Sequence, residues 1–164
     1  MNIIALLVSS LQRKFTLLIV SGAGVGYSPY FPGTMGTLLA IPISIGFNGI
    51  AAHAPLSFGL LLVVLTAGAI SLSTKAAELL KQKDPQVIVI DEVIGFMIAN
   101  YLAPARLAPL VLGFLLFRCF DIAKVFPAAR LEKLPGGLGI VLDDVMAGLY
   151  SFVIVQSALH WEWL

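Results

Sequence analysis

The distribution of charged residues most strongly limits what this chain can fold into. No charged residue occurs between Lys14 and Lys75, so residues 15–74 form one long uncharged stretch. A second uncharged stretch separates Asp144 from Glu162. A helix needs about 20 apolar residues to cross the hydrocarbon core of a membrane. The first stretch can therefore hold two crossings, and the second can hold one.

The composition indicates an integral membrane protein. Of the 164 residues, 59% are hydrophobic and 12% are charged, whereas a soluble domain carries about 25% charged residues. The length fits a single domain, residues 1–164. The net charge of +1 provides no basic face for nucleic acid, so we expect no nucleic-acid partner. The sequence gives no indication of oligomeric state.

We predict an all-α membrane bundle with about five short crossings. Two further segments are predicted outside these crossings: a short interfacial helix over Met1–Lys14 and an amphipathic linking helix over Thr74–Asp84. The predicted crossings are Gly36–Ala52, Leu56–Leu72, Val87–Ala103, Ala108–Phe120 and Val145–Trp161.

With five crossings, the Lys and Arg residues fall almost entirely on one side. Arg106 is the single exception among the ten. The positive-inside rule then places the N-terminus in the cytoplasm. The acidic residues follow the same division, with Glu162 as their exception. We therefore expect an active site on the cytoplasmic face.

Two pairs of adjacent acids lie in apolar segments, Asp91-Glu92 and Asp143-Asp144. A charge at membrane depth costs about 2.5–3.5 kcal/mol or more, so such residues are rare unless they are paired, face water or bind a metal. The structural alternative is helix capping, with Glu92 paired to a Lys. Capping needs only one acid, which favours a functional interpretation.

Three further charges, Arg118, Asp121 and Lys124, are spaced by three and would share one helix face. They either form a salt-bridge trio or combine a metal-binding Asp with two phosphate-binding cations. A Gly- and Pro-rich loop with hydroxyls at Thr34 and Thr37 precedes the first crossing. Its backbone N–H groups could hold an anion. The alternative is an ordinary loop leading into the membrane.

All four elements meet at the same membrane face. Clustered carboxylates repel one another unless a cation joins them, and hard oxygen ligands suit Mg²⁺ or Mn²⁺. This combination indicates metal-assisted phosphoryl chemistry. Cysteine-phosphatase chemistry is excluded because no Arg lies six residues after Cys119, and a histidine nucleophile is disfavoured because His53 and His160 fall on the far face.

Together these stretches resemble the phosphatidylglycerophosphatase A family. Val125 departs from the pattern, because the family usually has Pro after the motif Lys. The matching motifs are Pro-Gly-Thr-x-Gly-Thr at 32–37, Asp-Glu-x-x-Gly at 91–95, Phe-Arg-x-Phe-Asp-x-x-Lys at 117–124 and Gly-Gly-x-Gly-Ile-x-x-Asp-Asp-x-x-Ala-Gly at 136–148.

The resemblance implies a Mg²⁺-dependent hydrolase that converts phosphatidylglycerophosphate to phosphatidylglycerol and phosphate, in phospholipid biosynthesis at a bacterial cytoplasmic (inner) membrane. Its partners would be the phospholipid substrate and membrane lipid. The nucleophile would be a metal-bound water or one of the Asp side chains. We assign the metal to Asp91, Glu92, Asp143 and Asp144, a further ligand or base role to Asp121, and phosphate binding to Thr34, Thr37, Arg118 and Lys124.

Two other functions are compatible with parts of this pattern. A metal-dependent lipid head-group transferase would require a nucleotide or alcohol as a second substrate. A small transporter subunit would carry acids along a path through the membrane depth. The first two predicted crossings contain no acid, which argues against transport.

Overall fold

The computed structural model describes residues 3–163, with side chains from residue 10 onward, and all regular secondary structure in this part of the chain is helical. The prediction of an all-α fold is therefore confirmed. The elements are α1 (Ile3–Val20), the 3₁₀ turn η1 (Val25–Tyr27), α2 (Pro32–Ala51), α3 (Pro55–Leu80), α4 (Ile90–Ala99), α5 (Leu107–Ala123), α6 (Ala128–Leu131) and α7 (Gly137–His160).

Within the described residues, three helices are long and apolar enough to cross a membrane: α2, α3 and α7. Helix α5 has 17 residues and α4 only 10, which correspond to about 25 Å and 15 Å at 1.5 Å per residue. The hydrocarbon core is about 30 Å thick. Three crossings are thus supported by helix length, while the number five remains a prediction.

The predicted third crossing, Val87–Ala103, is helical only over α4. The residues before it are irregular, with the Val89 N–H donating to the Val20 carbonyl at 2.8 Å. The residues after it contain Leu102 at φ 60°, which no helix can accommodate. This largely apolar segment is therefore helical over only part of its length.

Two shorter predictions also need correction. The amphipathic helix expected over Thr74–Asp84 is the end of α3, which continues without a break to Leu80 and is followed by irregular backbone. The helix expected over Met1–Lys14 extends instead to Val20. Met1 and Asn2 lie outside the described residues.

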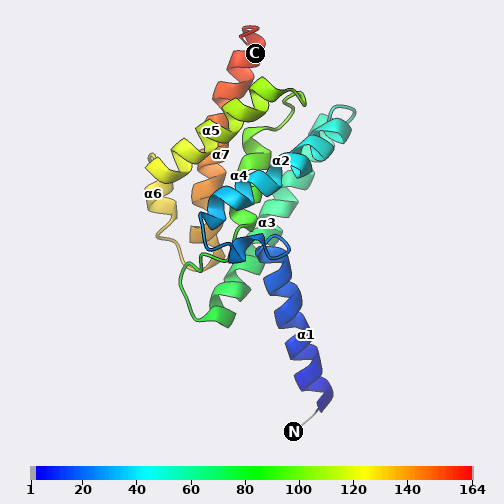
Figure 1. Ribbon diagram of the computed structural model, residues 1–164, viewed down its shortest axis with the longest axis vertical. Coiled ribbons are helices and arrows are strands. Elements are labelled where there is room, and N and C mark those ends of the chain that lie inside the picture. The colour runs from blue at the N-terminus through cyan, green and yellow to red at the C-terminus, as the bar shows by residue number, and fades with distance from the viewer. Residues whose placement is uncertain (1–2, 164) are drawn as a thin grey trace.

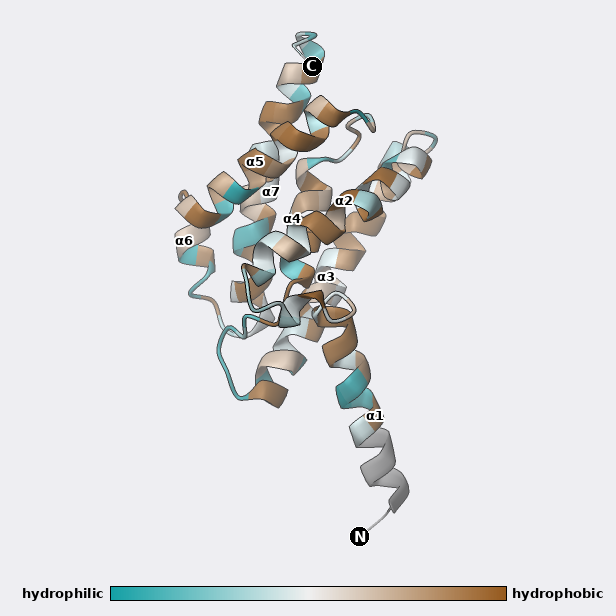
Figure 2. Cartoon of the chain, viewed as in Figure 1, coloured by the Kyte–Doolittle hydropathy of each residue, from teal (hydrophilic) through white to brown (hydrophobic). Residues whose placement is uncertain are grey.

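Helix α4 lies at the centre of the bundle and contacts α2, α3, α5 and α7, while α1 lies beside the lower half of α3 and projects away from the others (Figure 1). Apolar residues cover much of the surface of the long helices, and hydrophilic residues gather in the lower loops and where α5 and α7 approach α4 (Figure 2). Helix α4 therefore lies next to the hydrophilic residues at the centre of the molecule.

Helices α4 and α7 cross at two glycines. A Cβ on Gly95 would lie 2.9 Å from the Asp144 carbonyl oxygen, and a Cβ on Gly148 would overlap the carbonyl oxygen of Gly95. Small residues allow such a close backbone approach between helices in membranes. Because Asp91 lies one turn before Gly95, this crossing brings the two acid pairs of the sequence together.

Candidate active site

A polar cavity of about 270 Å³ lies where the first turns of α2 and α4 meet the end of α5 and the first half of α7. Eight of the nine site residues predicted from the sequence line it. Its wall consists of Phe31, Pro32, Gly33, Thr34, Asp84, Gln86, Ile88, Asp91, Glu92, Arg118, Asp121, Lys124, Ile140, Asp143 and Asp144.

Three carboxylates form the most compact group in this cavity. Asp91, Glu92 and Asp144 each offer one oxygen atom, and these atoms all lie within 4.8 Å of one another. Asp91 and Asp144 are buried, with 8% and 4% of their surface exposed. Such proximity between buried negative charges is unfavourable without a cation between them.

The donor set fits a hard divalent cation. Within residues 3–163, the Oδ1 atom of Asp91 and the Oε2 atom of Glu92 are buried and have no hydrogen-bond partner. Unpaired buried carboxylate oxygens are costly, and the ligands here are all oxygen, with neither His nor Cys in the cavity wall. Mg²⁺ takes ligands of this kind.

Asp143 lies in the same cavity but pairs with a cation of the protein. Its Oδ2 atom accepts a hydrogen bond from the Lys124 Nζ at 2.8 Å, and Lys124 is also 2.8 Å from Glu132. Partial burial of Lys124 opposes its charged form, but the hydrogen bonds to Asp143 and Glu132 outweigh this and raise its pKa above the ordinary value. Lys124 therefore stays protonated and joins α5 to α7.

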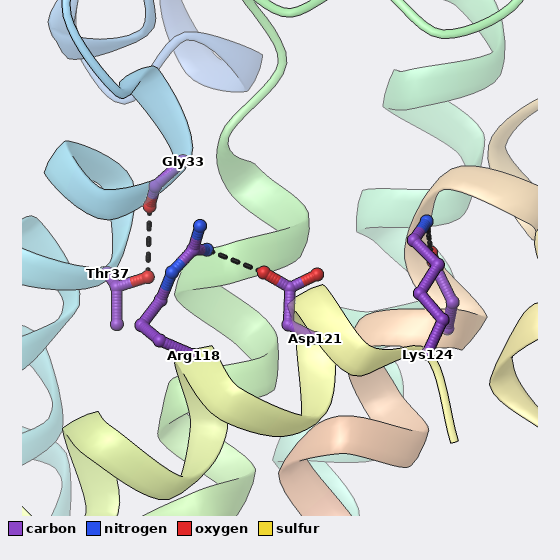
Figure 3. A network of polar contacts seen from close by, with 6 residues as sticks. Gly33, Thr37, Arg118, Asp121 and Lys124 are labelled. Atoms are coloured by element: carbon purple, nitrogen blue, oxygen red, sulfur yellow. Dashed lines mark hydrogen bonds and ion pairs between the residues drawn. The ribbon is translucent and has the colours of Figure 1, made fainter.

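Arg118 and Asp121 form an ion pair on the last turns of α5, with 2.7 Å between Nη1 and Oδ2 (Figure 3). The Nε atom of Arg118 is buried and has no hydrogen-bond partner among the described residues. The sequence predicted that Lys124 would share this helix face. Instead α5 ends at Ala123, and Lys124 takes φ 46° and turns toward Asp143.

The two predicted threonines behave differently. Both belong to the first turns of α2 rather than to the preceding loop. Thr34 lines the cavity, whereas Thr37 is fully buried and donates its hydroxyl to the Gly33 carbonyl at 2.9 Å (Figure 3). Among the side chains that the structure describes, none caps α2, so the first-turn N–H groups of Gly33 and Thr34 are available to an anion in the cavity.

The sequence did not identify several residues of the cavity wall. Asp84 and Gln86 are exposed residues of the irregular segment after α3, and Ile88 and Ile140 are buried apolar residues. Nothing in their local pattern separates them from other residues of loops or of the core. The path of residues 81–89 across the start of α4 brings the first three to the cavity, and Ile140 reaches it from the first turn of α7.

Comparisons with known proteins identify one family, by a family model and by two named relatives. The phosphatidylglycerophosphatase A family model matches residues 18–159. A relative from Bacteroides thetaiotaomicron, with the provisional name phosphatidylinositol-3-phosphatase, is 35% identical over 147 residues, 87% of this chain and 92% of its own. Phosphatidylglycerophosphatase A from Escherichia coli is 34% identical over 146 residues, 87% of this chain and 83% of its own.

A second phosphatidylglycerophosphatase A, from Haemophilus influenzae, is 41% identical over 76 residues, covering 45% of this chain and 47% of its own. No solved structure matches this chain. The family match covers all four motifs that line or support the cavity. The chain therefore belongs to the phosphatidylglycerophosphatase A family, whose name denotes hydrolases of a phosphate monoester.

Proposed function

We propose that this protein is a Mg²⁺-dependent phosphatase that hydrolyses phosphatidylglycerophosphate to phosphatidylglycerol and inorganic phosphate, in the phospholipid biosynthesis of a bacterial cytoplasmic membrane. One observation carries the proposal: three carboxylates, two of them buried, converge in a single cavity beside a guanidinium whose buried Nε has no partner among the described residues, in a chain of this family. The first group can bind a cation, and the second can bind the phosphate that the cation helps to neutralise.

Asp91, Glu92 and Asp144 would hold the Mg²⁺, with Asp143 beside them. When bound, Mg²⁺ neutralises charge on the phosphoryl oxygens and lowers the pKa of nearby water. The acids also have a role without it, because they exclude an anionic substrate from the cavity until a cation is present. Activity should therefore require both the acids and the metal.

Arg118 would bind the phosphate monoester. Its buried Nε–H needs an acceptor, and a guanidinium binds phosphate oxygens in a bidentate manner. The first turn of α2, beside Arg118, adds its N–H groups and the Thr34 hydroxyl to the same cavity. Lys124 contributes positive charge at the rim while it holds Asp143 in place.

Asp121 would keep the Arg118 guanidinium in the cavity through their ion pair and accept a proton from the attacking water. Water adds to the phosphorus atom, the bond between phosphorus and the glycerol oxygen breaks, and that oxygen takes up the proton that Asp121 accepted. Direct attack by an Asp carboxylate is the alternative chemistry, and it would leave a phosphorylated protein that can be trapped.

The assay is phosphate release from phosphatidylglycerophosphate by the detergent-purified protein, with Mg²⁺ and then with excess chelator. Phosphatidylinositol 3-phosphate is measured in parallel, because one relative carries that name. We expect Mg²⁺-dependent release that is fastest with phosphatidylglycerophosphate. Absence of release from either lipid by folded protein would refute the proposed activity.

Replacing the acids tests their assignment. Asp91→Asn and Asp144→Asn each keep the side-chain volume but remove a metal-binding charge, so we expect turnover to fall about 10³-fold or more while the protein remains folded. Glu162→Gln, which changes an acid outside the cavity wall, is the matched control and should retain full activity. Full activity in both Asp variants would contradict the assignment.

A further inference from the structure

Helix α4 carries Asp91 and Glu92 in its first turn, yet it ends at Ala99, inside a bundle of helices that cross the membrane. The last carbonyl groups of any helix lack partners within the helix. In hydrocarbon no water is present to satisfy them, so irregular backbone at membrane depth must be hydrogen-bonded within the protein. The side chains that bond this end of α4 therefore come from neighbouring helices.

One side chain from α2 supplies most of these bonds. The Nδ2 group of Asn48 donates to the Asn100 carbonyl at 2.6 Å and to the Ala103 carbonyl at 3.3 Å. Its Oδ1 atom accepts from the Leu102 N–H at 3.1 Å. Asn48 is only 8% exposed. The donor and the acceptor of its amide group are thus both hydrogen-bonded to the backbone of the four residues that follow α4.

This bonding also holds a strained backbone. Leu102 has φ 60°, in the left-handed region that is unfavourable for a residue with a branched side chain. Such a conformation persists where the surroundings fix it. The bond between the Leu102 N–H and Asn48 is one such restraint, so the turn that ends α4 depends on α2.

The same face of α2 contacts α4 at both ends. Near the start of α4, a Cβ on Gly36 would lie 2.7 Å from the Val89 Cβ. Near its end, the Asn100 Nδ2 group donates to the Ser44 hydroxyl at 3.1 Å, one turn before Asn48. The two helices therefore run in the same direction, and these contacts with α2 fix how far α4 lies along the helix axis.

We propose that Asn48 is a positioning residue for catalysis: by anchoring the end of α4 to α2, it sets the depth at which Asp91 and Glu92 stand beside Arg118 and the first turn of α2. The coupling is direct because α2 also contributes Gly33 and Thr34 to the cavity. Misplacing reacting groups by about 1 Å can lower a rate about 10²-fold.

Two variants test this role. Asn48→Ala removes all three bonds, whereas Asn48→Gln keeps the amide group but lengthens its stem by one methylene, which displaces the anchored backbone. We expect kcat per folded molecule to fall about tenfold or more in both variants, with KM within about twofold of the wild-type value. The substrate is whichever of the two lipids named above the wild-type protein hydrolyses faster.

Thr66→Val is the matched control. It also removes a polar group from a spanning helix, but the Thr66 hydroxyl donates to the Leu62 carbonyl of its own helix at 2.8 Å. Its kcat should equal that of the wild type. Asn48→Gln also guards against a folding failure of Asn48→Ala, because it retains every hydrogen-bonding group.

Hydrogen exchange supplies a readout that does not need activity. If Asn48 positions the whole of α4, the Asn48 variants will exchange faster at the amides of Val93 and Ile94 in the acid-bearing first turn, as well as at residues 100–103. Faster exchange confined to residues 100–103, or a lower melting temperature with unchanged kcat, would overturn the proposal. An inactive wild-type protein would count against the proposed function. The exchange comparison alone would then test the positioning role of Asn48.

Discussion

At the scale of single residues, the site depends on the absence of a side chain at Gly33. A Cβ on Gly33 would overlap the Glu92 carboxylate and would lie 3.2 Å from the Arg118 Nη1. Both the acid and the cation therefore approach the first turn of α2 only because residue 33 is glycine. The spacing of the sequence motif identifies this glycine but does not show what occupies the space beside it.

Gly33→Ala tests this use of space. We expect kcat/KM to fall at least about tenfold, because the added methyl group displaces Glu92 and Arg118, while α2 itself is not weakened since Ala favours a helix by about 1 kcal/mol over Gly. Gly49→Ala in the same helix adds its methyl group to open space and should keep wild-type kinetics. Equal kinetics in both variants would show that Gly33 has no role in the cavity.

At the scale of secondary-structure elements, the α4–α7 crossing unites the two acid pairs. Neither helix could approach the other as closely with side chains at positions 95 and 148. The tightness of this contact explains how Asp91 and Asp144, far apart in the sequence, offer oxygens to one small volume. Stability and site geometry are therefore set by the same contact.

Gly148→Ala should separate these helices. Overpacking a close contact costs about 1–3 kcal/mol, or a melting temperature lower by about 2–12 °C for a chain of this size. Gly68→Ala in α3 places its methyl group in open space and should leave the melting temperature unchanged. Thermal unfolding of both proteins in the same detergent provides the comparison, and equal melting temperatures would mean that the crossing tolerates a larger residue.

Much of the site could be predicted because charge is rare in this chain. Asp91, Asp144 and Arg118 stand out against an apolar background, and their role follows from the cost of burying charge. Two things could not be predicted. Hydropathy does not show where α4 ends, since the sequence stays mostly apolar from Val93 to Ala103, whereas the backbone after Ala99 leaves the helix and bonds to Asn48. Spacing also cannot show that Thr37 donates to its own helix.

At the scale of the whole molecule, the connections divide between two ends. The α2–α3 and α4–α5 connections and the C-terminus lie toward one end, and residues 81–89 and the segment between α5 and α7 lie toward the other (Figure 1). Arg106 belongs to the first group, and most other Lys and Arg residues belong to the second. This agrees with a cytoplasmic cavity, the orientation that we propose.

Labelling with a membrane-impermeant thiol reagent tests the orientation in a Cys119→Ser background. Ala105→Cys should react in cells with a permeable outer membrane, while Lys133→Cys should react only after the inner membrane is opened. His53→Cys is the control for the outer side, since it lies between two helices long enough to cross. Reaction of Ala105→Cys only with opened cells would mean that α4 does not bring the chain across.

The shortness of α5 has a consequence for the lipid around the protein. Helix α4 is enclosed by its neighbours, but α5, about 25 Å long, would create a hydrophobic mismatch on its own flank beside helices long enough to cross a membrane. The bilayer there must become thinner, or the longer helices must shield the short helix from the lipid. Turnover should therefore depend on bilayer thickness as well as on the substrate. We expect faster turnover in vesicles whose lipids have shorter acyl chains.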